Sequence, residues 1–169
     1  MITLRPATID DLPLLQHWDE QPHVVESDPS DDWQWETELL RAPEGREQLI
    51  AELDGRPIGF IQIIDPALEE SHYWGDVSDT LRAIDIWIGE LGDTGKGYGS
   101  EMMRLALDRC FADPRVTSVL IDPLASNTAA HRFYERLGFR FVAEQRFGED
   151  DTRVYALHRD DFLSGRGGS

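Results

Sequence analysis

Gly95-Lys96-Gly97-Tyr98-Gly99-Ser100 decides the fold, because this stretch lies between an apolar strand pattern at Leu81–Ile88 and a helical pattern from Ser100 to Phe111. The first backbone N–H groups of a helix have no partner within it, and with the helix dipole they attract a phosphate or pyrophosphate. Glycines allow that group to approach the backbone closely. The spacing fits neither the G-x-G-x-x-G of dinucleotide-binding folds nor a P-loop, so a plain structural turn is the remaining alternative.

The segment before this stretch begins with a strand pattern at Ile2–Arg5 that Pro6 can close. Thr8 and Asp11 have the spacing of a capping box, and an amphipathic helical pattern follows them. Residues 22–32 contain prolines and many acids, which predicts a loop. We expect a second helix near residues 33–41 and a wall for an acceptor substrate in this region.

A hairpin is predicted from two apolar-rich runs, Gln48–Leu53 and Arg56–Ile64. Asp54-Gly55 joins them, and this dipeptide is favoured in tight turns because both central residues need positive φ. Residues 65–80 are irregular, acidic and aromatic, and we expect them to line a surface or a cleft.

The C-terminal part predicts a short β-branched strand at Thr117–Ile121 and an amphipathic helix at Asn127–Leu137, which Gly138 ends in a left-handed conformation. Two closing strands follow at Phe139–Gln145 and Thr152–His158.

These patterns predict an α/β fold with a mixed, mostly antiparallel twisted sheet flanked by helices. We expect its central strands, Leu81–Ile88 and Thr117–Ile121, to be splayed apart. The length of 169 residues suits one domain, which we expect at residues 1–163. Residues 164–169 have linker composition and are expected to form a flexible tail.

The charge balance bears on the partner, because 33 acidic residues against 16 basic ones give a net charge of −17. Such a chain repels phosphates, so nucleic acid is an unfavourable partner, whereas acidic walls of a cleft would attract a cationic ligand. Solubilisation of the surface by acidic residues is the alternative explanation.

Cys110 is the only cysteine, so no internal disulfide can form, and its helical context predicts a buried position. No apolar run is long enough to span a bilayer, and the N-terminus lacks the pattern of a signal peptide. We therefore expect a cytoplasmic protein without membrane association, and we expect no metal site.

A second motif, Asn127-Thr128-Ala129-Ala130-His131-Arg132-Phe133-Tyr134-Glu135-Arg136-Leu137-Gly138-Phe139, follows the glycine-rich turn. Together the two motifs resemble the GCN5-related N-acetyltransferase family, and the resemblance runs from Ile2 to about His158. It implies acetyl-coenzyme A as the cofactor, with its pyrophosphate on residues 95–100. Thr94 stands where the family usually has glutamine or arginine.

The resemblance also implies roles for residues around these motifs. Tyr134 would protonate the coenzyme A sulfur, and Asn127 would contact the cofactor; a core tyrosine and a plain helix cap are the alternatives. The main chain of Ile86, Trp87 and Ile88 would pair with the pantetheine arm, and a backbone N–H there would polarise the thioester carbonyl.

Two aspartates are candidates for amine recognition. Asp85 interrupts an apolar strand, where a carboxylate costs several kcal/mol unless it has a partner or borders a cleft. Asp122 follows the next strand, just before Pro123, and a turn or capping role is its alternative.

Several features are similar to the aminoglycoside 6'-N-acetyltransferase branch of the family, which acetylates these antibiotics and confers resistance. They are His-Val-Val-Glu at residues 23–26, the hairpin sequence at 54–60, Tyr73-Trp74, Ile84-Asp85, Gly95-Lys96-Gly97, Ile121-Asp122-Pro123 and Ser126-Asn127. The likeness implies that Asp85 accepts the proton of the attacking amine. It also implies that Asp85 and Asp122 bind ammonium groups of the antibiotic, and that Trp74 and Asp76 form walls of the sugar site.

Two other functions stay open. A member of the same family could acetylate another amine, such as a protein N-terminus, a polyamine or a siderophore precursor, because a fold does not specify the acceptor. An acyl-coenzyme A sensor without turnover is the alternative of another class. We expect a monomer or a homodimer.

Overall fold

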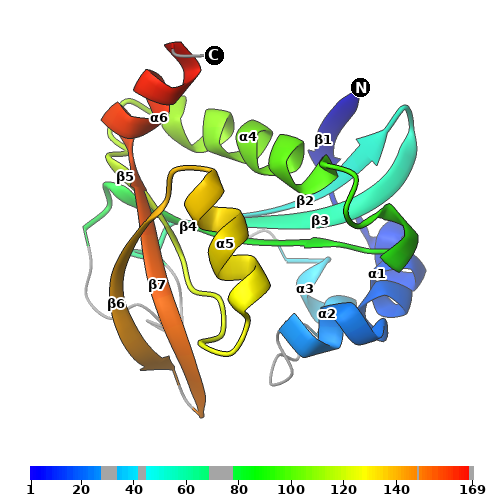
Figure 1. Cartoon of the computed structure of the whole chain (residues 1–169). Coiled ribbons are helices and arrows are strands. Elements are labelled where there is room, and N and C mark those ends of the chain that lie inside the picture. Colours follow the sequence, from blue (N-terminus) through cyan, green and yellow to red (C-terminus); the bar gives the residue numbers. More distant parts are fainter. Residues whose placement is uncertain (28–33, 42–44, 69–77, 148, 168–169) are drawn as a thin grey trace. The chain divides into compact units, whose positions relative to one another are not determined.

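The computed structural model describes residues 1–27, 34–41, 45–68, 78–147 and 149–167 (Figure 1). The chain divides into two compact units, and each unit uses two separate segments of the sequence. Unit one comprises Met1–Ile64 and Asp85–Ala106, and unit two comprises Asp65–Ile84 and Leu107–Ser169.

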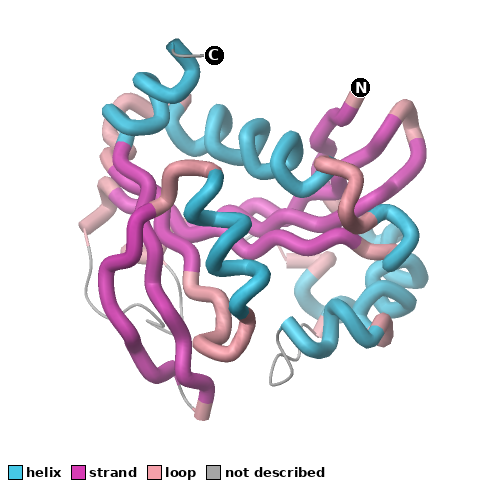
Figure 2. Tube along the Cα trace, in the orientation of Figure 1, coloured by secondary structure: helices cyan, strands magenta, loops and turns pink. Residues whose placement is uncertain are grey.

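Unit one has strands in the order β1-β2-β3-β4 (Figure 2). They are β1 (Ile2–Pro6), β2 (Arg46–Leu53), β3 (Arg56–Ile64) and the Asp85–Ile88 part of β4 (Leu81–Ile88). Its helical segments are η1 (Ile9–Asp11), α1 (Leu12–Asp19), α2 (Pro22–Ser27), α3 (Trp35–Glu38), η2 (Leu91–Asp93) and the Tyr98–Ala106 part of α4 (Tyr98–Phe111).

The hairpin of β2 and β3 confirms the predicted turn, since φ is 49° at Asp54 and 88° at Gly55. Its register changes by one residue beside Pro57. Glu52 lies opposite Pro57, but Ala51 lies opposite Gly59, so Ile58 is the extra residue of a β-bulge. In a two-residue hairpin without this bulge, each residue of β2 beyond Glu52 would lie opposite the β3 residue one position earlier in the sequence.

The strands of unit one are covered on both faces by helices (Figure 1). The side chain of Phe60 lies on the sheet face that packs against α1 and α3. Its ring stacks on that of Trp87 with the centroids 5.0 Å apart, and it meets the Trp35 ring edge-on with the centroids 5.1 Å apart. The preceding residue, Gly59, points to the opposite face, because successive residues of a strand alternate. A Cβ on Gly59 would lie 2.6 Å from Cε of Met102 in α4.

The end of β4 depends on a second close approach. A Cβ on Gly89 would lie 2.0 Å from the Trp18 indole, so no side chain fits there. Trp18 is fully buried and meets Trp87 edge-on at 5.5 Å. The N–H of Gly89 also donates to the carbonyl of Ile58 at 2.9 Å, so α1, β3 and the end of β4 all meet at this glycine.

Unit two has strands in the order β4-β5-β7-β6. They are the Leu81–Ile84 part of β4, β5 (Ser118–Ile121), β7 (Asp150–His158) and β6 (Arg140–Phe147), and the helices are the end of α4, α5 (Thr128–Arg136) and α6 (Arg159–Gly167). β4 and β5 are parallel and pair from Leu81–Ser118 to Ala83–Leu120, while the other strand pairs are antiparallel.

Polar contacts tie the elements of unit two together. Arg159 at the start of α6 donates to the carbonyls of Phe111 and Asp113 at 3.0 and 2.7 Å, and to that of Val116 at 2.9 Å. Arg115 beside Asp113 holds the pKa of the Asp113 carboxyl at about 2 through hydrogen bonds from its side chain and its backbone N–H. Asp113 is therefore ionised throughout the neutral range.

Most predicted elements are confirmed, and the main differences concern helices. Residues 22–27 form a helix where a loop was predicted, and Pro22 is tolerated in its first turn, where the missing N–H costs nothing. The helix predicted at 33–41 covers only Trp35–Glu38 of the described residues. Helix α6 continues to Gly167, into the segment expected to be a flexible tail. Cys110 is buried as predicted.

We expect Gly89→Ala to lower the free energy of unfolding by about 1–3 kcal/mol, because the new methyl group overlaps the indole of Trp18. Gly92→Ala is the matched control, since a Cβ there meets no atom within 4 Å, and its effect should stay within about 0.5 kcal/mol. Urea denaturation of both variants measures the difference. Equal stability of the two variants would contradict this packing constraint.

Candidate active site

The segment that leads from β4 to the glycine-rich loop is anchored by a bidentate ion pair. Arg56 of β3 donates to both carboxylate oxygens of Asp93 at 2.9 and 3.1 Å, and Asp93 is buried. The Asp93 carboxylate raises the pKa of the Arg56 guanidinium, which therefore remains charged at any working pH. Thr94, the departure from the family pattern, donates its hydroxyl to the Leu91 carbonyl at 2.6 Å and so closes η2.

The loop itself has the geometry of an anion cradle. Gly95 and Gly97 have φ of 73° and 82°, a region that glycine adopts without strain. A Cβ on either residue would meet no atom within 4 Å, so the space over this backbone is open. Helix α4 begins at Tyr98 rather than at Ser100, and its first N–H groups have no partner within the helix. The loop therefore fits a pyrophosphate.

The end of β4 is held from the α1 and α2 side by two histidines. His23 of α2 donates through Nε2 to the carbonyl of Ile88 at 2.8 Å. His17 of α1 lies 2.9 Å from Glu90. The Trp87 side chain is packed in the aromatic core, so any role of Trp87 toward a ligand belongs to its main chain.

Asp85 has a neutral polar partner. The amide nitrogen of Gln62 in β3 donates to its Oδ2 at 3.0 Å, and Gln48 in β2 donates in turn to the Gln62 amide oxygen at 3.0 Å. The carboxylate that interrupts the apolar pattern of β4 therefore lies half-buried beside the Gln62 amide.

The other candidate residues belong to unit two. Asp122 is half-buried directly after β5. Asn127 caps α5, since its side-chain oxygen accepts from the N–H of Ala130 at 3.2 Å.

Tyr134 lies on α5 and is half-buried. The centroid of its ring lies 5.2 Å from that of Phe133 and 5.8 Å from that of Phe139. His131 on the same helix is buried and hydrogen-bonded through Nε2 to the Leu124 carbonyl at 2.9 Å.

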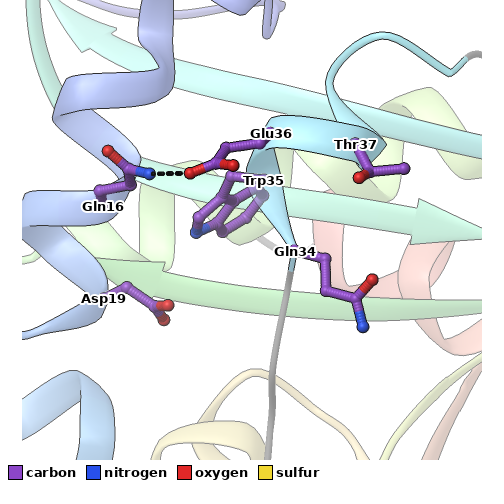
Figure 3. Close-up of a pocket in the computed structure, with 6 residues that line it drawn as sticks. All are labelled: Gln16, Asp19, Gln34, Trp35, Glu36 and Thr37. Atoms are coloured by element: carbon purple, nitrogen blue, oxygen red, sulfur yellow. Dashed lines mark hydrogen bonds between the residues drawn. The ribbon is translucent and has the colours of Figure 1, made fainter.

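A polar pocket of about 370 Å³ lies between α1 and α3 (Figure 3). Gln16 donates to Glu36 at 3.3 Å across this pocket, and the indole of Trp35 forms its apolar wall. Its lining residues are Gln16, Asp19, Gln34, Trp35, Glu36 and Thr37. The pocket falls at the edge of the region where an acceptor wall was predicted.

Two of the predicted residues, Trp74 and Asp76, lie outside the described residues. Sequence reasoning missed Gln62 and Gln48, although each is a polar residue inside an apolar strand pattern, the signal that singled out Asp85. Among the described residues, no group of three His, Cys, Asp or Glu side chains could hold a metal ion. No helix in that part of the chain combines the length and apolar character that crossing a membrane requires.

Comparison with known proteins agrees with this geometry. Residues 8–147 match the family described as the acetyltransferase (GNAT) domain. The chain belongs to the GNAT acetyltransferase family. GNAT acetyltransferases are acyltransferases that use acetyl-coenzyme A, so the resemblance, the GNAT fold and the cofactor predicted from the two motifs are confirmed.

Known relatives of this GNAT acetyltransferase include the aminoglycoside N(6')-acetyltransferase type 1 of Klebsiella pneumoniae, 33% identical over 154 residues that cover 82% of this chain and 73% of that protein. The lysine N-acyltransferase MbtK of Mycobacterium tuberculosis is 26% identical over 160 residues, which cover 91% of this chain and 76% of MbtK.

Among solved structures, aminoglycoside acetyltransferase AAC(6')-Ib in complex with coenzyme A and kanamycin superposes with a TM-score of 0.88. The two chains are 28% identical, and the match covers 98% of this GNAT acetyltransferase and 99% of AAC(6')-Ib.

Proposed function

We propose that this acetyltransferase transfers the acetyl group of acetyl-coenzyme A to the 6'-amino group of an aminoglycoside and thereby confers resistance. The observation that carries the proposal is Asp85, a half-buried carboxylate on β4 to which the neutral amide of Gln62 donates a hydrogen bond. A carboxylate in an apolar strand can bind an incoming ammonium group by a charge-assisted hydrogen bond, or take up a proton from an amine. The likeness to aminoglycoside N(6')-acetyltransferases supports the same acceptor.

Acetyl-coenzyme A supplies the acetyl group as a thioester. In this proposal the backbone of Gly95, Gly97, Gly99 and Ser100, with neighbouring Lys96 and Tyr98, holds its pyrophosphate. The main chain of Ile86–Ile88 pairs with the pantetheine arm and orients the thioester carbonyl, while Asn127 and Tyr134 contribute further contacts. The exposed Lys96 adds a positive charge to the cradle.

The proton steps are assigned to two side chains. Asp85 accepts the proton that the amine nitrogen loses as its bond to the acetyl carbon forms. Tyr134 donates its hydroxyl proton to the sulfur as the carbon–sulfur bond breaks. Backbone N–H groups at the end of β4 stabilise the negative charge that develops on the carbonyl oxygen.

Acidic side chains would select a polycationic acceptor. By the resemblance, Asp85 and Asp122 bind ammonium groups of the antibiotic, and Trp74 and Asp76 form walls of the sugar site. Asp19 and Glu36 line the pocket between α1 and α3 and give it the negative charge that such a ligand requires. The net charge of −17 attracts polycations at long range.

A pair of substrates tests both the acceptor and the position. Neomycin and paromomycin differ only at the 6' carbon, which bears an amine in neomycin and a hydroxyl in paromomycin. We expect thiol release and a singly acetylated product with neomycin and none with paromomycin. Equal turnover of both would place the reaction at another amine. Turnover restricted to spermidine, a lysine side chain or a peptide N-terminus would favour the other acceptors.

Gly97→Val should weaken acetyl-coenzyme A binding by on the order of 10-fold or more, because its side chain would occupy the open space over the loop. Gly55→Val is the matched control, since Gly55 also has positive φ and open surroundings but lies in the hairpin turn. Both variants carry the same backbone strain. Calorimetric titration should show normal affinity in the control, and normal affinity in Gly97→Val would refute the cradle.

Asp85→Asn and Tyr134→Phe separate proton acceptance from proton donation, and both substitutions nearly conserve size. Asp85→Asn should lower kcat/KM for neomycin by on the order of 10²-fold or more while acetyl-coenzyme A still binds. Tyr134→Phe should lower kcat less, because a thiol with a pKa near 8.5 is already a tolerable leaving group. Steady-state kinetics of the two variants measure these changes. Near-normal turnover by Asp85→Asn would show that Asp85 has no part in the mechanism.

A further inference from the structure

A row of polar side chains crosses three strands of unit one at the edge of the aromatic core. Along each strand the polar residue lies two positions from a core residue, so both point to the same face. The pairs are Gln48 with Ile50 on β2, Gln62 with Phe60 on β3, and Asp85 with Trp87 on β4. Hydrogen bonds of 3.0 Å join Gln48 to Gln62 and Gln62 to Asp85.

Gln62 is the central member of this polar row. Only 6% of its surface is exposed, and a buried amide is costly unless its donor and acceptor are both satisfied. Its oxygen accepts from Gln48 and its nitrogen donates to Asp85, so each end of the amide has a hydrogen bond. This orientation presents a donor to the carboxylate, which suits the ionised form of Asp85.

We propose that Gln62 is the positioning residue for Asp85, and that Gln48 orients Gln62 for this task. The inference rests on the proposed function, in which Asp85 accepts the proton of the attacking amine. The Gln62 hydrogen bond holds the carboxylate in one rotamer and one plane. Because Gln62 is a neutral amide, it favours the ionised form of the carboxylate less than an arginine at the same position would.

The polar row can also serve Asp85 after it has taken up the proton. If both side-chain amides flip, so that oxygen and nitrogen exchange places, the Gln62 oxygen accepts from the protonated carboxyl, and the Gln62 nitrogen donates to the Gln48 oxygen. Every member keeps its hydrogen bonds in both states, since an amide has a donor end and an acceptor end. A single charged partner in place of the two glutamines could not reverse in this way.

Gln62→Met tests the proposal by removing both hydrogen bonds at similar side-chain length. We expect kcat with neomycin to fall on the order of 10-fold or more, while KM for acetyl-coenzyme A and the melting temperature change little. Gln48→Met should cause a smaller fall. Gln145→Met, at an exposed position on β6, is the control and should behave as wild type. A kcat of Gln62→Met within twofold of wild type would overturn the proposal.

Gln62→Glu tests the proposal through the pH profile of kcat/KM, which would not change if Gln62 had only a structural role. It keeps the shape but places a second carboxyl group at the 3.0 Å contact, so the two groups share a proton and one pKa rises. The acid limb of the kcat/KM profile should therefore move to higher pH. An unmoved limb in a folded variant would refute the coupling.

A carbon-13 NMR titration of the Asp85 carboxyl, assigned with Asp85→Asn, separates this inference from the proposed function. It needs no acceptor substrate. Should the wild-type enzyme acetylate no aminoglycoside, the proposed function fails, yet a raised Asp85 pKa in Gln62→Glu would still establish the coupling. An unchanged titration would overturn the positioning role, even if aminoglycosides are acetylated.

Discussion

The close approach of Trp18 to Gly89 is the constraint on which unit one depends. The indole occupies the space where any other residue would carry its Cβ. This contact fixes α1 against the end of β4 and leaves Trp87 edge-on to Trp18 and stacked on Phe60. The chain then passes through η2 into the glycine-rich loop. The start of α4 is therefore set by aromatic packing that begins in the first helix.

The β-bulge at Ile58 is the second constraint, and its consequence lies at the candidate site. Before the bulge, Glu52 faces Pro57, as a two-residue turn requires. Beyond it, Gln48 faces Gln62; without the extra residue, Gln48 would face Ile61. The bulge thus brings the half-buried amide of Gln48 and the buried amide of Gln62 together on the face that carries Asp85. The Ile58 carbonyl accepts the N–H of Gly89, so the two constraints meet at one hydrogen bond.

Elements with a strong local signal could be predicted from the sequence. The strand at Leu81–Ile88 and the Asp54-Gly55 turn agree with the structure because apolar pattern and positive φ depend on neighbouring residues alone. The short helix at Pro22–Ser27 was mistaken for a loop, since six residues are too few to show a helical period. Its stability comes from contacts such as that of His23 with Ile88, which lie far apart in the sequence.

The sequence by itself determined the family, the cofactor and the unusual position of Asp85. Each depends on residue types at short spacing: glycines before a helix, an asparagine and a tyrosine on one helix, and a carboxylate within an apolar strand. Only the tertiary structure decided what lies beside that carboxylate. Gln48 and Gln62 look like ordinary strand residues, and they become a hydrogen-bonded row because a bulge sets the register of β2 and β3 and because β4 lies beside β3. Register and strand order depend on packing across the sheet, which local sequence does not encode.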